Sequence, residues 1–211
     1  RLKKGLERYG AKAGVVIVMD PKTGGILASA SYPSYDPGLY SEFPDEYFRN
    51  PVVADSYEPG STFKPLVMAV AVNEGKIKPT DTFDEQGPVR VNEYSIKTWN
   101  NEYHGMGSMT QILEYSSNVG MVHIANKLGN DSILSFLKSI GFGEKTGIDL
   151  QDEASPLLRP DGQWHDIDYA TASFGQVIAV TPLQMVRAVG ALANDGWLMK
   201  PQVVKQIVGD D

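Results

Sequence analysis

The chain has 211 residues, of which 42% are hydrophobic and 21% are charged, and these proportions indicate a folded globular protein rather than a disordered one. Its formal net charge of -7 argues against a nucleic-acid partner, because nucleic-acid-binding domains carry basic patches. The absence of cysteine excludes disulfides, cysteine nucleophiles and zinc–thiolate sites. No apolar run approaches the length that crosses a bilayer, and since the chain does not begin with methionine we expect it to be a piece of a longer protein.

The first predicted element is a β-hairpin over residues 13–31. Two apolar stretches, 15–19 and 26–30, flank the sequence Asp-Pro-Lys-Thr-Gly, which is typical of a turn. The residues from 31 to 57 are rich in Tyr, Pro, Asp and Ser and predict a long loop. Loops of that length are usually functional or folded over a surface.

A mostly helical region is predicted between residues 61 and 196. Its first helix runs from Ser61 to Glu74, and two further helices flank the triplet Ser116-Ser117-Asn118. The remaining predicted elements are helices over 109–115 and 119–128, strands at 89–91 and 95–98, a helix over 132–140 capped by Asp131, and a helix from Pro182 to about Asn194 that begins with a capping box of Thr181 and Gln184. Strands followed mainly by helices favour an α+β domain whose helices pack on a sheet, and one hairpin makes that sheet incomplete.

Ser61 and Lys64 form the pattern S-x-x-K within EPGSTFKPLVMAV, at residues 58–70. Residues three apart share a helix face, so the two side chains are predicted to meet. Unpaired backbone N–H groups at a helix N-terminus favour the oxyanion that develops when a serine attacks a carbonyl. A lysine among apolar neighbours loses its proton more readily and can then accept the proton of the serine. Because the pattern is short, a helix cap and a solvated lysine are the better explanation of it without further context.

Ser116 and Asn118 supply part of that context, since they interrupt a helical pattern. A hydroxyl and an amide held in such a turn can relay a proton and bind a substrate amide. Taken alone, the triplet is explained more simply as a polar connection between two helices. The combination of S-x-x-K, S-D-N and K-T-G motifs, however, is the signature of class A β-lactamases and penicillin-binding proteins.

Several longer segments resemble the transpeptidase domain of class B penicillin-binding proteins, from about residue 13 to 201. The segments that carry the resemblance are EPGSTFKP, YSSNVGM, GEKTGIDL, ILASASYPSYDP, RNPVV and ATASFGQVIAVTPLQMVRAVGALANDGWLMKP. The last of these is most similar to division-type and sporulation-type members. The resemblance implies the fold of serine β-lactamases and transpeptidases, in which helices pack on an antiparallel sheet.

The resemblance also implies a function: a D,D-transpeptidase that cross-links peptidoglycan stem peptides through an acyl-serine intermediate. Ser61 would be the nucleophile and Lys64 its base, Ser116 would pass the proton to the leaving D-alanine, and Asn118 would hold the peptide backbone of the substrate. β-Lactam antibiotics would acylate Ser61 as substrate mimics, and neither a metal nor a cofactor is needed. The complete protein would be anchored in the cytoplasmic membrane with this domain outside, beside a polytopic glycosyltransferase that polymerises glycan.

Lys145-Thr146-Gly147 reads KTG, but we expect a structural loop here. The catalytic KTG of the family lies on a later inner strand and is usually followed by a small or hydroxyl residue and alanine, whereas Ile148 follows here. We therefore expect residues 1–211 to be the N-terminal and central part of a transpeptidase domain, without the C-terminal strands that carry the true KTG. The chain on its own is then expected to show little or no catalysis.

Two other functions stay open at this point. A serine β-lactamase would need a carboxylate that activates water, and none can be assigned from the sequence. A β-lactam-sensing or scaffold domain would keep the acylation site without turnover. Rapid loss of a bound penicilloyl group would favour the β-lactamase, and a stable adduct without transpeptidation would favour the sensor.

Other polar and aromatic residues receive weaker predictions. The three histidines show no Ser/His/Asp order and no metal-binding spacing, and His123 is predicted to be a satisfied core residue. Asp166 and Asp168 are predicted to be loop or capping residues, and the segment 173–176 to pack beside the site. Tyr57 and Trp99 are both candidates for the lining of a substrate cleft. Ordinary packing is the alternative for both residues, and it is favoured more strongly for Tyr57.

Overall fold

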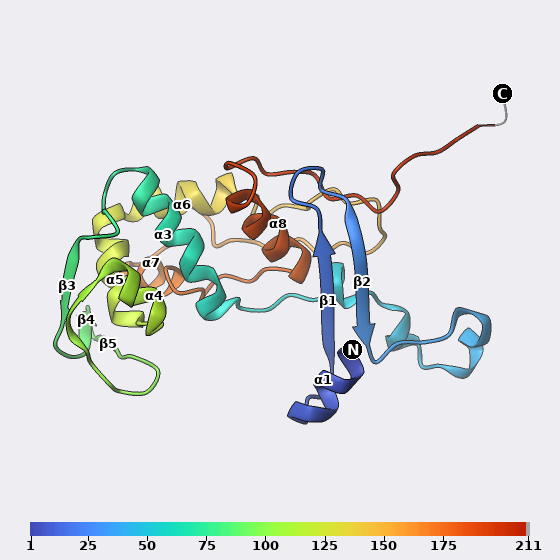
Figure 1. Cartoon of the computed structure of the whole chain (residues 1–211), viewed down its shortest axis with the longest axis horizontal. Helices are drawn as coiled ribbons and strands as arrows, with labels where there is room; N and C mark the ends of the chain where they lie inside the picture. The colour runs from blue at the N-terminus through green and yellow to red at the C-terminus, as the bar shows by residue number, and fades with distance from the viewer. Residues whose placement is uncertain (210–211) are drawn as a thin grey trace. The chain divides into compact units, whose positions relative to one another are not determined.

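The computed structural model describes residues 1–209, which divide into two compact units (Figure 1). The hairpin unit comprises residues 1–57, 141–156 and the chain from 180 onwards. The helical unit comprises residues 58–140 and 157–179. Helices and antiparallel strands together confirm the predicted α+β class. None of the helices in residues 1–209 is long and apolar enough to cross a membrane.

The hairpin unit is built around strands β1 (Gly14–Met19) and β2 (Ile26–Tyr32), which pair antiparallel with a register shift between Val18 and Met19. The turn between them is held by Asp20, whose carboxylate accepts the Lys22 N–H at 2.9 Å and the Thr23 hydroxyl at 2.8 Å. Helices α1 (Leu2–Tyr9) and α8 (Pro182–Leu192) lie against this hairpin (Figure 1). The core of the unit consists of Val52, Val53, Ala54, Ile148 and Leu183, against which Val15, Ile17, Ile26 and Leu150 pack.

Helix α8 begins as the sequence predicts. The Thr181 side chain accepts the Gln184 N–H at 3.1 Å, the Gln184 side chain accepts the Thr181 N–H at 2.8 Å, and Pro182 occupies the first turn. This reciprocal pairing satisfies two backbone donors that the helix itself cannot satisfy.

The prediction of one long loop from 31 to 57 was wrong in part. The segment contains the end of β2, the 3-10 helices η1 (Pro37–Glu42) and η2 (Asp45–Phe48), and helix α2 (Pro51–Ala54). Asn50 caps α2 by accepting the Val52 N–H at 3.1 Å, and Val52 to Ala54 are buried. An asparagine cap followed by proline is the local signal for this helix, but four residues are too few to show a helical period.

The helical unit is built from η3 (Gly60–Phe63), α3 (Lys64–Asn73), β3 (Thr82–Glu85), β4 (Val89–Val91), β5 (Tyr94–Ile96), β6 (Gly105–Ser108), α4 (Met109–Glu114), α5 (Asn118–Leu128), α6 (Asn130–Ser139) and α7 (Asp166–Ala172). Helix α5 packs against helices α3, α4, α6 and α7 and strand β3. The strands form two antiparallel pairs, β3 with β6 and β4 with β5. Strand β6 also lies against α4, and β4 lies against α7.

Two predicted helix starts in this unit were wrong. Helix α6 begins at Asn130 after Gly129, so Asp131 lies in the first turn and is not the cap. Gly129 both ends α5 and begins α6, and its φ of 85° and ψ of 158° suit a residue without a side chain. The α-helix predicted from Ser61 begins only at Lys64, and Gly60–Phe63 form a 3-10 turn. The cause is Pro65, which has no N–H to donate to the Ser61 carbonyl, so the Lys64 N–H bonds that carbonyl in the 3-10 pattern.

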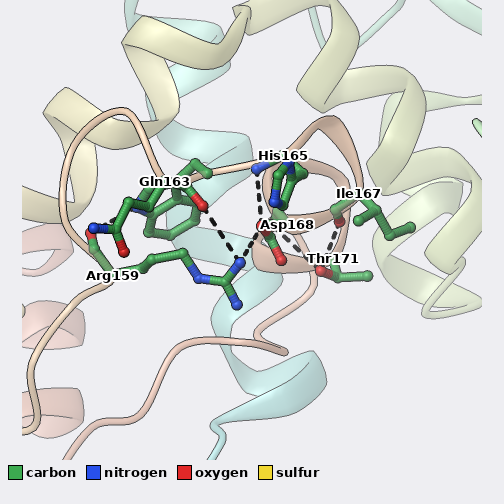
Figure 2. Close-up of polar contacts among 7 residues, drawn as sticks. Arg159, Gln163, His165, Ile167, Asp168 and Thr171 are labelled. Atoms are coloured by element: carbon green, nitrogen blue, oxygen red, sulfur yellow. Dashed lines mark hydrogen bonds and ion pairs between the residues drawn. The ribbon is translucent and has the colours of Figure 1, made fainter.

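Helix α7 is anchored by an ion pair at its first turn, drawn in Figure 2. The carboxylate of Asp168 accepts the His165 N–H at 2.9 Å and the Arg159 guanidinium at 2.7 Å. The Asp168 side chain is 8% exposed, whereas that of Arg159 is 39% exposed. The prediction that Asp168 caps a helix is thereby confirmed.

Replacing Asp168 by alanine is expected to lower the free energy of unfolding by about 2 kcal/mol, because it removes a helix cap and leaves Arg159 unpaired. Asp161→Ala is the matched control, since Asp161 pairs with Lys138 on the surface and such pairs contribute little. Urea unfolding of both variants measures the difference. Equal stability of the two variants would contradict the role given to Asp168.

Candidate active site

Ser61 lies in the η3 turn, and Lys64 is the first residue of α3. The turn is fastened by the Gly60 N–H, which donates to the Gly175 carbonyl at 2.9 Å, and by the Thr62 hydroxyl, which donates to the Pro59 carbonyl at 2.7 Å. Ser61 is exposed, whereas Lys64 is only 1% exposed. The S-x-x-K sequence therefore places a hydroxyl at the surface and an amine in the interior.

The buried amine of Lys64 joins the two other predicted site residues. Its Nζ donates to the Ser116 carbonyl at 2.6 Å, to Ser116 Oγ at 3.0 Å and to Asn118 Oδ1 at 2.8 Å. An ammonium has three hydrogens to donate, so all three can be satisfied here. Residues more than fifty positions apart in the sequence thus form one polar cluster.

Burial lowers the pKa of Lys64 to about 8, because the charged form is poorly solvated among buried neighbours. The negative charge of Glu85 acts in the opposite direction and raises this pKa. An amine with a pKa near 8 is partly neutral near neutral pH and can accept a proton. An ordinary surface lysine, with a pKa near 10.4, is almost entirely charged there.

The turn that carries Ser116 and Asn118 has a distinct local structure. Ser116 has a φ of 53°, in the left-handed region that non-glycine residues seldom adopt. Ser117 is the N-cap of α5, and its hydroxyl accepts the Gly120 N–H at 2.8 Å. The Asn118 amide nitrogen donates to the Lys97 carbonyl at 3.2 Å. The turn is therefore held by one hydrogen bond through Ser117 and another through Asn118.

Ser61 opens onto a cavity of about 640 Å³. Trp99, which is 74% exposed, lines this cavity. The ring of His104 stacks on that of Tyr115 with centroids 3.9 Å apart, and both line the cavity. The other lining residues are Asn100, Glu102, Glu114 and Ser116.

The family described as "Penicillin binding protein transpeptidase domain" matches residues 14–211 of this chain. The chain belongs to this family. The resemblance to class B members of the division and sporulation type is confirmed by the curated relatives. The "Peptidoglycan D,D-transpeptidase FtsI homolog" of Chlorokybus atmophyticus is 40% identical over 218 residues, covering 96% of this chain and 32% of that protein. "Stage V sporulation protein D" of Bacillus subtilis is 37% identical over 201 residues, covering 94% of this chain and 31% of that protein.

A solved structure agrees with this assignment. The crystal structure of a peptidoglycan glycosyltransferase from Burkholderia ambifaria superposes with a TM-score of 0.86 at 28% identity, covering 100% of this chain and 62% of that one. The predicted fold of penicillin-binding transpeptidases is thereby confirmed. The chain spans about a third of the length of the two curated relatives described above.

In this transpeptidase domain, the structure brings three of the four predicted site residues into direct contact. Lys64, Ser116 and Asn118 are joined by hydrogen bonds, whereas within residues 1–209 Ser61 Oγ makes no hydrogen bond with Lys64 Nζ. The lysine donates to Ser116 and Asn118 instead, and Ser61 faces the cavity. Hydrogen bonds between catalytic groups often tighten only when substrate binds.

Residues 145–147, which read KTG, lie in a loop and not on a strand, as expected. The Glu153 carboxylate accepts the Thr146 N–H at 2.7 Å and the Gly147 N–H at 3.1 Å. The Thr146 hydroxyl donates to the same carboxylate. The loop therefore wraps around a carboxylate of its own unit. Tyr57 pairs through its backbone with Val180, at 2.9 and 3.0 Å, and lines a different cavity from Ser61.

The prediction for His123 was wrong in one respect. Its ring packs against Phe83 with centroids 4.5 Å apart, as expected of a core residue. Its Nε2 atom is buried, however, without a hydrogen-bond partner among the described residues. Burial, and to a smaller extent the neighbouring charge of Lys127, lower the pKa of His123 and so disfavour the charged ring.

Glu85, which ends strand β3 and is 5% exposed, is a site residue that the sequence does not predict. One oxygen of its carboxylate accepts the Ser117 hydroxyl, and the other accepts the His104 N–H at 3.3 Å. Buried carboxylates are rare unless they are paired, so burial alone marks this residue as unusual. The sequence TFDEQ gives no such signal, because it reads as an exposed polar stretch.

Proposed function

We propose that this chain is the acylation region of a D,D-transpeptidase that cross-links peptidoglycan stem peptides, and that β-lactams acylate the same serine. The observation that carries the proposal is the buried amine of Lys64, held within hydrogen-bond distance of Ser116 and Asn118 one turn from Ser61. Membership of the penicillin-binding transpeptidase family supports the reaction class.

In the proposed reaction, Ser61 Oγ attacks the carbonyl of the bond between the two terminal D-alanines. The neutral amine of Lys64 takes the hydroxyl proton, and the Ser61 ester forms as D-alanine leaves. Ser116 Oγ, which lies 3.0 Å from Lys64 Nζ, passes that proton to the leaving amine. An amine of a second stem peptide then attacks the ester, which forms the cross-link and frees Ser61.

Asn118 has two roles in this proposal. Its Oδ1 accepts a hydrogen bond from Lys64, and its amide nitrogen donates one hydrogen to the Lys97 carbonyl. An amide nitrogen carries two hydrogens, so one remains to bind the backbone carbonyl of a stem peptide. Asn118 would thus orient both the base and the substrate.

The full-length protein would work outside the cytoplasm, anchored in the cytoplasmic membrane, with a polytopic glycosyltransferase as its partner. The family membership and the names of the relatives support this setting.

The rate of acylation by a β-lactam is expected to rise roughly tenfold between pH 7 and pH 9 and then to level off. The pKa of Lys64 is lowered to about 8, so the neutral amine is the minor form at pH 7 and the major form at pH 9. Stopped-flow measurements with a fluorescent penicillin over this range check the midpoint. A rate that is flat from pH 7 to pH 9 would contradict the role of Lys64 as base.

Transpeptidation is tested with the full-length polypeptide that carries this sequence, a stem pentapeptide ending in D-Ala-D-Ala, and an acceptor amine. We expect release of D-alanine and formation of the cross-linked peptide, and the loss of both in Ser61→Ala. The lifetime of the penicilloyl adduct separates the alternatives. Rapid hydrolysis would point to a β-lactamase, and a stable adduct without any cross-linked product would point to a sensor or scaffold.

A further inference from the structure

We propose that Glu85 is a positioning residue for the acylation of Ser61, because its buried carboxylate fixes the turn that places Ser116 and Asn118 around Lys64. This inference rests on the proposed function. It adds to the proposed site a residue that lies outside the S-x-x-K, S-D-N and K-T-G motifs. Glu85 ends strand β3 and is 5% exposed, and its carboxylate contacts the turn through the Ser117 hydroxyl.

The first step is the contact between Glu85 and Ser117. The Ser117 hydroxyl donates to Glu85 and accepts the Gly120 N–H at 2.8 Å, so one oxygen atom ties β3 to the first turn of α5. Ser117 is itself 3% exposed. Both partners are therefore out of water, where a hydrogen bond to a carboxylate is stronger than at the surface.

The second step is the position of Ser117 in the chain. Its two neighbours, Ser116 and Asn118, provide all three oxygen atoms that Lys64 Nζ contacts. Ser116 has a φ of 53°, a conformation that persists only when its surroundings enforce it. Release of Ser117 from Glu85 would remove one of the contacts that enforce it, and the partners of Lys64 would shift together.

The third step is electrostatic. The charge of Glu85 raises the pKa of Lys64 and so offsets part of the effect of burial. Two other titratable residues, His104 and Tyr115, line the same cavity of about 120 Å³ as Glu85. Glu85 thus acts on Lys64 both through the turn and through its charge.

Glu85 is poorly placed to activate water, as a β-lactamase carboxylate must. One of its oxygens accepts the Ser117 hydroxyl, and the other accepts the backbone N–H of His104 at 3.3 Å. Both oxygens are therefore engaged in joining β3 to the turn and to the residue that precedes β6. A positioning role fits these contacts better than a role in hydrolysis.

The test compares Glu85→Gln with Asp84→Asn in the full-length polypeptide. Asp84 is the exposed neighbour on the same strand, so its variant removes one charge without touching Ser117. Acylation by a fluorescent penicillin is followed from pH 6 to pH 10. In Glu85→Gln we expect the rate on the high-pH plateau to fall roughly ten- to a hundredfold, since small displacements of reacting groups have effects of that size. We also expect the midpoint of the profile to move to lower pH.

A purely structural role for Glu85 would lower stability without moving the pH midpoint. The titration of Lys64 by NMR, with lysine labelled at the ε-carbon and Lys64→Arg to assign the signal, reports the same midpoint without any β-lactam. If Glu85→Gln fails to fold, Ser117→Ala replaces it and is expected to lower the plateau rate by a similar factor. Wild-type rates and midpoints in the folded variants would overturn the inference. A wild-type protein that is not acylated would instead overturn the proposed function, while the NMR midpoint still tests the action of Glu85 on Lys64.

Discussion

Replacing Lys64 by methionine is expected to slow the acylation of Ser61 by roughly 10²- to 10⁴-fold, the range that general bases contribute. The substitution keeps an unbranched apolar stem in a site that is 1% exposed, so the helix should still pack. It removes the amine that is held by Ser116 and Asn118. The rate with a fluorescent penicillin at pH 8 measures the effect.

The matched control is Lys76→Met, because Lys76 is an exposed lysine just beyond the end of the same helix. It should be acylated at the wild-type rate. Thermal unfolding establishes that both variants are folded. A folded Lys64→Met protein that reacts as fast as wild type would show that another group takes the proton of Ser61.

The second large effect is expected at Gly175, whose backbone lies directly against the η3 turn. A Cβ atom added there would lie 2.2 Å from the Gly60 carbonyl oxygen and 2.6 Å from the Gly60 nitrogen. Gly60 and Gly175 are also joined by a hydrogen bond of 2.9 Å. Gly175→Ala must therefore displace the residue that precedes Ser61, and we expect acylation to fall at least about tenfold.

The same substitution should lower the free energy of unfolding by about 2–4 kcal/mol. This loss has two causes, the cost of a left-handed backbone at a residue with a side chain and the steric clash of the added Cβ. Gly162→Ala separates the two causes. Gly162 has a φ of +77°, against +78° for Gly175, but nothing lies within 4 Å of its added Cβ. The Gly162 variant should lose only the backbone part and keep its acylation rate. Equal losses of activity in both variants would contradict the close contact as the cause.

The sequence predicts those parts of the fold and site that depend on short-range patterns. The hairpin follows from two apolar stretches around a turn, and α8 follows from a capping box formed by residues three apart. Lys64, Ser116 and Asn118 are found because their motifs are compact, and the structure brings the three together. That the S-x-x-K motif and the Ser116-Ser117-Asn118 triplet belong to one site is predicted from the resemblance to a family and not from physical pattern alone.

The parts that the sequence does not predict depend on contacts between distant segments. Strands β3 and β6 have no alternation of apolar and polar residues, and β6 contains two glycines, so only their mutual pairing defines them. The contact between Gly60 and Gly175 joins backbones more than a hundred residues apart. Glu85 is exceptional only because the fold buries it. The 3-10 turn at Ser61 is a local effect of Pro65, which a helix prediction based on apolar spacing overlooks.

The central claim is that Ser61 is the residue acylated, and intact-mass spectrometry of the full-length polypeptide with and without benzylpenicillin tests it most directly. We expect the mass to increase by one penicillin, the modified peptide to contain Ser61, and the Ser61→Ala variant to stay unmodified. An unmodified wild-type protein, or an adduct on a peptide without Ser61, would contradict the account.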